Sequence, residues 1–426
     1  MASRWLAVAG CLVAVSALGA CGSSDKKSSS SGTSSASSGG GNVTVFTSLP
    51  FDATDRQQTE DVVKGEKLAL SQINSKVGPC NITFKQLDDS TAQAGQWDAG
   101  QVSSNARKAA QDKSVVGYIG EFNSGASAIS IPITNQANLM QISPSNTALE
   151  LTKDPGPSGK GAPGKYYPTG KRTYARVVAA DHIQGAVQGA WMKELGVKKL
   201  FEANDKQVYG TGVAKTTGDA AKLNGIQVVG NEGIDIKAPN YRALAAKIKA
   251  SGADAFFFGG ITASNGVQLY KDVYAANPSI KLFGPDGVAQ DTFTTKVPKA
   301  AQKQTYITVG TIDPKDYPPE GQKFFQDFKA KYGTATPQPY AIYGYEAMSL
   351  LLDSMKRAGA KCNDRQAIID EVFKTKNKPS VLGTYSVDKD GDVTTKQFGR
   401  FFIVGGKLKY DKTVQVEKDS SGHPLG

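Results

Sequence analysis

The alternation of short apolar runs with amphipathic segments of helical length constrains the fold of this chain more than any other feature. Residues 42–50 (NVTVFTSLP) read as a strand, and residues 55–75 as a helix with Val62, Ala69 and Leu70 on one apolar face. Further strand-like runs follow at 80–90, 114–122 and 139–145, with helical segments between them. This pattern predicts a parallel β-sheet whose strands are connected by helices.

The pattern restarts after a stretch rich in proline, glycine and lysine at residues 153–172. The second series runs from KKLFEAND at 198–205 to SIKLFGPDG at 279–287, with three helical segments between. Two similar series predict an α/β protein with two doubly wound, Rossmann-like lobes. In such folds ligands bind in the crevice outside the carboxyl ends of the strands.

The remaining segments do not form a third domain. They read as a strand at 303–312, helices at 320–333, 339–360 and 364–376, and a hairpin at 398–410 with its turn at Gly405–Gly406. We expect them to add to the two lobes, so that the chain crosses between the lobes several times.

The N-terminus has the pattern of an export signal. Arg4 precedes a short apolar run, and Leu18-Gly-Ala-Cys21 looks like a bacterial lipobox. We therefore expect residues 1–20 to be a signal peptide and Cys21 to be lipidated, although an ordinary signal peptide is the alternative. The Ser/Gly-rich residues 21–42 form the expected flexible linker. The predicted location is the outer face of the cell membrane.

Charge and histidine content argue against two classes of function. The net charge is +11, but the basic residues are interleaved with acidic ones, which is not the pattern of a nucleic-acid-binding arm. The chain has two histidines, His182 and His423, and no Gly-x-Ser-x-Gly sequence, so a catalytic serine lacks its partners. We expect a protein that is not an enzyme.

No metal or cofactor site is expected either. Asp388–Asp392 (DKDGD) resembles a calcium loop, but its glycine comes two residues early and no closing glutamate follows, so an Asp-Gly turn is the better interpretation. Tyr209–Gly212 (YGTG) lacks the third glycine of a dinucleotide-binding turn.

Two cysteines remain once the signal is removed and Cys21 is lipidated. Cys80 and Cys362 each follow a predicted helix in an exported, oxidising setting. A disulfide between them is one interpretation, and two separate thiols are the other.

Hydroxyl side chains follow two neighbouring strands of the first series. Ser124 lies where a strand ends and a helix begins, so it could cap the helix or help to hold an anion. The next strand is followed by QISPSNT, which brings Ser143, Ser145 and Thr147 to the same sheet edge. Because a carboxylate needs such donors, we favour a carboxylate site at this edge.

These segments resemble a known family. Residues 114–152 and 171–187 are similar to the type I periplasmic binding proteins of branched-chain amino acid ABC transporters, and the resemblance extends from Val43 to about Tyr410. It implies two lobes, 43–168 plus 288–382 and 169–287 plus 383–412, joined by a three-stranded hinge and followed by a polar tail at 413–426. It also implies that both cysteines lie in the same lobe.

The resemblance assigns roles to individual residues. Ser124 and Thr147 would hold the ligand carboxylate, the backbone carbonyl of Ser145 would face its ammonium group, and Tyr209 would face the ligand from the second lobe. The loops around Phe51–Gln58 and Thr262–Asn265 would determine specificity, so that Gln58 is a candidate contact.

One position departs from the family. Where amino acid binders place a glutamate for the ammonium group, this chain has Ser264. An ammonium group buried without a carboxylate is costly, so either Glu121, Asp205 or Asp286 compensates or the ligand has no ammonium group there.

The expected function is therefore that of a solute-binding lipoprotein. It would capture a small carboxylate-bearing ligand, first of all a branched-chain amino acid, as a monomer, and deliver it to the permease of an ABC transporter. A ligand sensor that signals to a partner protein is the alternative with the same fold.

Overall fold

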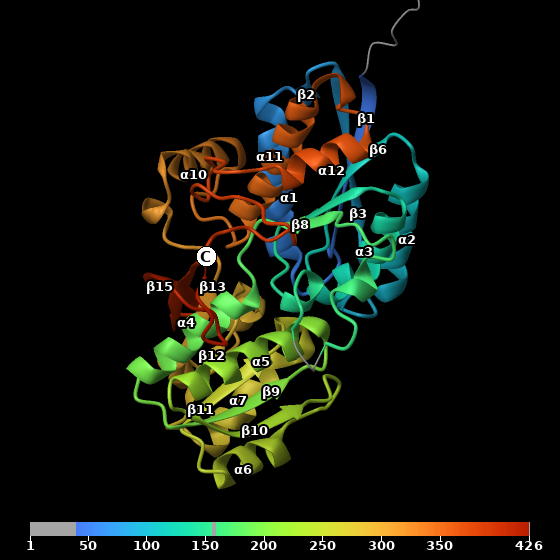
Figure 1. Cartoon of the computed structure of the whole chain (residues 1–426). Coiled ribbons are helices and arrows are strands. Elements are labelled where there is room, and N and C mark those ends of the chain that lie inside the picture. Colours follow the sequence, from blue (N-terminus) through green and yellow to red (C-terminus); the bar gives the residue numbers. More distant parts are fainter. Residues whose placement is uncertain (1–39, 156–158, 426) are drawn as a thin grey trace, which may run out of the picture. The chain divides into compact units, whose positions relative to one another are not determined.

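The computed structural model describes residues 40–155 and 159–425, which contain two large β-sheets flanked by helices (Figure 1). The predicted signal peptide, Cys21 and nearly all of the predicted linker lie outside the described residues. None of the described helices is long and apolar enough to cross a membrane.

The first lobe is built on a six-stranded sheet with the order β2-β3-β1-β6-β7-β8. Its strands are β1 (Gly41–Leu49), β2 (Lys76–Val77), β3 (Cys80–Asp88), β6 (Val115–Gly120), β7 (Met140–Ser143) and β8 (Tyr174–Arg176). All neighbours are parallel except β2 and β3. A small separate sheet pairs β4 (Ser90–Thr91) with β5 (Gln96–Trp97). The helices of this lobe are α1 (Arg56–Gln72), α2 (Ala99–Gln111), α3 (Ser124–Gln136), α10 (Pro319–Tyr332), α11 (Ala341–Ala358) and α12 (Arg365–Phe373).

The second lobe is built on a seven-stranded sheet with the order β10-β9-β11-β12-β13-β14-β15. Its strands are β9 (Lys199–Asn204), β10 (Gln227–Gly233), β11 (Ala255–Gly259), β12 (Lys281–Gly284), β13 (Thr305–Val309), β14 (Gln397–Val404) and β15 (Lys407–Gln415). The last two strands form the predicted antiparallel hairpin. The helices are α4 (Asp181–Glu194), α5 (Val208–Leu223), α6 (Arg242–Ala250), α7 (Gly266–Ala276), α8 (Asp291–Thr294) and α9 (Lys299–Gln302).

Short 3-10 turns complete the structure: η1 (Leu149–Leu151), η2 (Gly164–Tyr166), η3 (Thr262–Ser264), η4 (Asp286–Val288), η5 (Pro314–Asp316) and η6 (Gly359–Lys361).

The chain crosses between the lobes three times, but later in the sequence than expected. The predicted boundary at 168/169 precedes β8, which pairs with β7 in the first sheet. The boundary at 287/288 precedes β13, which pairs with β12 and β14 in the second sheet. The third crossing falls after Asp392 rather than at 383, because Asp392 is paired with Arg176 of β8. Strand pairing decides the first two boundaries and the Asp392–Arg176 ion pair decides the third, and the sequence alone shows neither.

The predicted polar tail at 413–426 is part of the second lobe. β15 extends to Gln415, and the N–H of Ser420 donates to the carbonyl of His182 on α4 at 2.9 Å. Ser420 is buried, and the backbones of Lys418 and Pro424 pair in an isolated antiparallel β-bridge. These contacts fix the tail against the start of α4.

Close packing of two helices holds the first lobe together. A Cβ added to Gly65 of α1 would lie 2.2 Å from the carbonyl oxygen of Ala341 on α11. A Cβ added to Gly344 of α11 would likewise lie 2.3 Å from the carbonyl oxygen of Val62 on α1. Because no side chain stands between them at these points, helices distant in sequence approach backbone to backbone. This contact fixes the start of α11, which borders the cleft described below.

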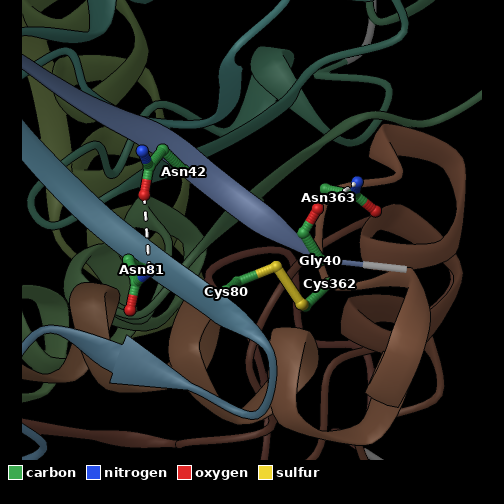
Figure 2. The surroundings of a disulfide bond; sticks show 6 residues. All are labelled: Gly40, Asn42, Cys80, Asn81, Cys362 and Asn363. Atoms are coloured by element: carbon green, nitrogen blue, oxygen red, sulfur yellow. Dashed lines mark hydrogen bonds between the residues drawn. A yellow bond between two sulfur atoms is a disulfide. The ribbon is translucent and has the colours of Figure 1, made fainter. Parts of the chain in front are cut away.

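The structure joins Cys80 and Cys362 in a disulfide with both cysteines in the first lobe (Figure 2). Cys80 begins β3 and Cys362 precedes α12, and both are buried. Beside the bond, the side-chain amide of Asn363 donates to the carbonyl of Gly40 at 3.2 Å. The disulfide therefore closes the end of the lobe at which β1 begins.

Candidate functional site

A cavity lies between the two lobes at the carboxyl ends of several strands. The space between its walls is about 450 Å³, including the part that opens to solvent. The wall residues are Asp55, Gln58, Phe122, Asn123, Ser124, Gly125, Ser145, Thr147, Gln207, Tyr209, Ile261, Asp286, Gly287, Gln290 and Tyr340. We call this cavity the cleft. Its position at the strand ends is where open α/β sheets bind ligands.

The first-lobe wall presents hydroxyl donors. Ser124 is the first residue of α3, and its Oγ accepts the N–H of Ala148 at 3.3 Å, which leaves its own hydrogen free to donate. Thr147 is 1% exposed, and its Oγ1 makes no hydrogen bond of normal geometry among the described residues, although it lies close enough to the buried carboxyl of Asp181 to lower the pKa of that group. The first N–H groups of a helix are also unpaired within the helix. Ser124 therefore does not cap α3 with its side chain but stands beside donors suited to an anion.

The two loops that carry these donors are bound to each other. The Ser145 hydroxyl donates to the carbonyl of Phe122 at 2.7 Å, and the Ser143 hydroxyl donates to that of Glu121 at 2.8 Å. The side-chain amide of Asn146 donates to both carbonyls, at 2.9 and 3.0 Å. The polar side chains of residues 141–147 thus bind the carbonyl groups that follow β6, and they hold Ser124 and Thr147 in place.

Asp286, at the start of η4, faces this wall from the other side of the cleft. Its Oδ1 accepts the hydroxyl of Tyr209 on α5 at 2.8 Å, and its Oδ2 accepts the hydroxyl of Tyr340 at 2.7 Å. Burial raises the pKa of the Asp286 carboxyl, while the bonds from the two tyrosines act in the opposite direction. Tyr340 precedes α11 of the first lobe, so this carboxyl is held by both lobes.

A second carboxyl, that of Asp55, lies before α1 on the first-lobe side. It is 2% exposed, and burial raises its pKa to about 6, against the lowering effect of the amide side chains of Gln290 and Asn123. Gln58, one turn further, also borders the cleft. The loop that was expected to determine specificity therefore contributes two polar side chains to the wall.

Glu121 does not reach the cleft. Its Oε1 accepts the hydroxyl of Tyr118 at 2.7 Å, and its carboxyl lies beside that of Asp89. Glu121 and Asp89 are both fully buried, and the pKa of Asp89 is raised well above its usual value by burial and by the nearby Glu121. The direction of its side chain, toward the lobe interior, separates Glu121 from Ser124 despite their closeness in sequence.

Ser264 lies behind the second-lobe wall. Its hydroxyl donates to Asp205 at 2.8 Å and accepts the side-chain amide of Gln207 at 3.2 Å. Gln207 in turn lines the cleft, while Ser264 and Asp205 do not. Of the three acidic residues considered as ammonium partners, Asp286 is the one that borders the cleft.

The lobes also touch at one edge of the cleft. The indole N–H of Trp97 in β5 donates to Oε1 of Gln207 at 3.3 Å, and the Gln207 amide donates to Gln96 at 3.4 Å. A Cβ on Gly125 would lie 2.8 Å from the Trp97 ring, so glycine is needed at this approach. These contacts close the cleft on the side of β5.

Several wall residues were not singled out from the sequence. Asn123 adjoins Ser124 and could have been found from that position, whereas Tyr340, Gln207 and Gln290 lie in unrelated segments. They reach the cleft through tertiary contacts, for which a single sequence contains no local signal.

The Asp388–Asp392 turn and His182 lie outside the cleft. The Asp388–Asp392 segment forms a turn whose carboxyls pair with Lys153 and Arg176. His182 borders a different depression beside this turn. Within 40–155 and 159–425, no group of three or more histidine, cysteine, aspartate or glutamate residues is arranged to hold a metal ion.

Two α/β lobes with a polar cleft between their strand ends define a two-lobed small-molecule binding protein. The chain belongs to the periplasmic binding protein family, whose model matches residues 49–400, and it is a type I member in the group that includes the Leu/Ile/Val-binding proteins. Proteins of this family bind substrates without transforming them, so the chain is a binding protein and not an enzyme.

Curated relatives match over most of their length. The amino acid binding protein of Pseudomonas aeruginosa is 27% identical over 290 residues, which cover 68% of this chain and 71% of that protein. The Leu/Ile/Val-binding protein homolog 1 of Brucella melitensis is 25% identical over 356 residues, which cover 82% of this chain and 87% of that protein.

Solved structures show the same fold. The leucine-binding protein LivK of Thermotoga maritima superposes with a TM-score of 0.75 at 21% identity, covering 88% of this chain and 99% of LivK. A solute-binding protein of R. palustris in complex with benzoate has a TM-score of 0.71 at 21% identity, covering 88% of this chain and 98% of that protein.

Proposed function

We propose that this protein is an extracytoplasmic solute-binding lipoprotein that captures an amino acid between its lobes and delivers it to the permease of an ABC transporter. The observation that carries the proposal is the pairing of opposite chemistries in one cleft. Hydroxyl and amide donors stand on the first-lobe wall, and the buried carboxyl of Asp286 stands on the other side.

The donor wall would bind the carboxylate of the amino acid. Thr147 has a hydroxyl without a partner, Ser124 can donate its hydrogen, and the N-terminus of α3 favours negative charge. Hydrogen bonds to an ionised group are about twice as strong as neutral ones. The free carboxylate would thereby gain partners for both oxygens when it leaves water.

Asp286 would bind the ammonium group, in the role for which the resemblance led us to expect a glutamate at Ser264. A cation beside this carboxyl would favour its charged form and oppose the effect of burial on its pKa. The carbonyl of Ser145, whose hydroxyl is already bound to Phe122, is the second candidate acceptor.

Ligand capture would couple to closure of the lobes. The first-lobe donors and the second-lobe residues Tyr209 and Asp286 contact the same space, so a ligand that binds both stabilises the closed arrangement. The Tyr340–Asp286 bond joins the lobes in that arrangement. The closed form is what the permease would recognise.

The names of the relatives support the choice of an amino acid, because they include an amino acid binding protein and Leu/Ile/Val-binding proteins. The disulfide supports an exported location, since such bonds persist in oxidising compartments. The lipobox-like sequence before Cys21 supports the anchor.

The binding step is tested by native mass spectrometry and by thermal unfolding of the purified protein with each of the twenty amino acids. A ligand should raise the melting temperature with the logarithm of its concentration. Failure of every amino acid to bind would contradict the proposal, and binding of benzoate alone would indicate a carboxylate ligand without an ammonium group.

The anchor is tested separately. Cells that express the protein are fed labelled palmitate, and label should appear in the wild-type protein but not in Cys21→Ser. Equal labelling of both, or none in either, would contradict lipidation at this residue while leaving ligand binding unaffected.

A further inference from the structure

The end of the cleft next to α1 is polar and rich in acceptors. Asp55 Oδ1, Gln58 Oε1 and Asn123 Oδ1 are buried there without hydrogen-bond partners among the described residues. Each of these side chains is at most 8% exposed and lines the cleft. Buried polar atoms are normally paired, so three unpaired acceptors at one end of a binding cavity require a partner of opposite character.

Asp55 decides what that partner is. An amide side chain such as those of Gln58 and Asn123 can present either its oxygen or its NH₂ group after rotation, whereas a carboxylate only accepts. The side-chain amides of Gln290 and Asn123 lower the pKa of Asp55 by hydrogen bonding to its carboxyl, but they do not offset the effect of its burial, and Oδ1 still lacks a partner. The group that completes this end of the cleft must therefore donate hydrogen bonds.

The charged residues that line the cleft have one sign. Its wall contains two carboxyls, Asp55 and Asp286, and no lysine, arginine or histidine. Behind Asp55 lies the buried carboxyl of Asp89, whose pKa is raised in part by Asp55. One carboxyl suffices for the ammonium group of an amino acid, so the other is left for a different part of the ligand.

We propose that the amino acid bound in this cleft has a side chain that donates hydrogen bonds, either an amide or a cationic group, and that Asp55 recognises it. This inference rests on the proposed function. A branched aliphatic side chain, which the names of several relatives suggest, would leave Asp55 Oδ1, Gln58 Oε1 and Asn123 Oδ1 buried without a donor from the ligand.

The experiment is calorimetry of the purified protein with two sets of ligands: leucine, isoleucine and valine, and glutamine, asparagine, lysine and arginine. We expect at least one member of the second set to bind at least tenfold more tightly than any member of the first. In Asp55→Asn, the affinity for that ligand should fall at least tenfold while the affinity for leucine does not fall.

Asp52→Asn is the matched control. Asp52 is an exposed carboxyl in the same loop and does not line the cleft. This substitution should leave all affinities unchanged, and Asp55→Asn should remain folded, because the Asp55 side chain does not cap α1.

The pH dependence separates the two kinds of side chain. The pKa of Asp55 is about 6, so affinity for lysine or arginine should fall as the pH drops from 8 to 5, beyond any fall seen with glutamine. Asp89 faces Asp55 but has a strongly raised pKa from burial, and Asp286 affects all amino acids alike. The excess loss should disappear in Asp55→Asn.

Tightest binding of leucine, isoleucine or valine would overturn this inference and leave the proposed function in place. Unchanged affinity of the preferred polar ligand in Asp55→Asn would also overturn it. If no amino acid binds, the proposed function fails and this inference fails with it.

Discussion

The hydroxyl of Tyr340, from the first lobe, donates to Oδ2 of Asp286, from the second lobe, with 2.7 Å between the oxygens. Tyr209 of the second lobe binds the other oxygen of the same carboxyl. Asp286 is thus both a wall of the cleft and a link between the lobes, and changes at this carboxyl should alter ligand affinity and closure together.

Replacing Tyr340 by phenylalanine tests this link. The change removes a hydrogen bond to a carboxyl, worth roughly 1.5–3 kcal/mol when the acceptor is charged, and should weaken ligand binding by about tenfold or more. Calorimetry measures the affinity, and small-angle X-ray scattering should show a more open average form. Tyr270→Phe is the control, because its hydroxyl binds the carbonyl of Phe283 within the second lobe. Equal affinities of Tyr340→Phe and wild type would contradict the linking role.

Thr147→Val should separate binding from stability. Valine keeps the shape of threonine, and the hydroxyl it removes makes no hydrogen bond of normal geometry in the described protein but lies beside the buried carboxyl of Asp181, so the melting temperature without ligand should change little. Affinity for the amino acid should fall by roughly 10- to 100-fold if the hydroxyl binds the carboxylate. Ser124→Ala is a less clean test, because it leaves the N–H of Ala148 without its acceptor.

Thr134→Val provides the opposite control. Its hydroxyl donates to the buried side chain of Gln141 at 2.8 Å, away from the cleft. This variant should lose stability and keep its affinity. A Thr147→Val protein that binds as tightly as wild type would remove Thr147 from the proposed site.

The buried pair of Asp89 and Glu121 predicts a pH dependence of stability. Burial raises the pKa of both carboxyls, so the folded protein holds a proton that the unfolded chain releases above about pH 4. The stability from this pair is therefore present at low pH and decreases as the pH rises toward the raised pKa values. Urea unfolding between pH 5 and 8.5 should show a smaller decrease in Asp89→Asn than in wild type.

Glu60→Gln serves as the control for this experiment, since Glu60 is a half-buried surface carboxyl in an ion pair with Arg56. Its unfolding free energy should follow that of the wild type across the same range. An identical pH profile for Asp89→Asn and wild type would show that the buried pair does not retain a proton.

Removing the disulfide should destabilise the first lobe. Loss of a native disulfide costs typically 2–5 kcal/mol, so Cys80→Ser with Cys362→Ser should unfold at a clearly lower temperature. Reductant should lower the melting temperature of the wild type to that of the double variant and leave the variant unchanged. A wild-type protein that is insensitive to reductant, and whose Cys80 and Cys362 are alkylated in the native state, would contradict the bond.

Gly65→Ala should disrupt the contact between α1 and α11. The added Cβ would lie 2.2 Å from a backbone oxygen, so the helices must move apart, at a cost of roughly 1–3 kcal/mol or more. Gly212→Ala in α5 is the matched control, because nothing lies within 4 Å of its added Cβ and alanine favours a helix. Equal melting temperatures for the two variants would contradict the tight packing.

The secondary structure followed from the sequence because it depends on local periodicity. The predicted strand at 42–50 and helix at 55–75 correspond to β1 and α1 within a few residues. The lobe boundaries did not follow, because the sheet to which β13 belongs depends on its partners β12 and β14.

The same distinction applies to the cleft. Ser124 and Thr147 follow strands of one sheet, so their proximity could be inferred from the order of the elements. The bond between Tyr340 and Asp286, and the inward direction of Glu121, depend on side-chain packing between distant segments.

The Cys80–Cys362 disulfide beside Gly40 affects how a force on the chain is transmitted. β1 runs from this corner, between β3 and β6, to the loop that carries Asp55 at the cleft. A pull on the chain ahead of Gly40 would act first on the Asn363 contact and on the pairing of Gly41 with Pro79 and Cys80, and the disulfide ties Cys80 to Cys362. The load would pass into the body of the lobe, and the opposite end of β1 could keep its position while the lobes open and close.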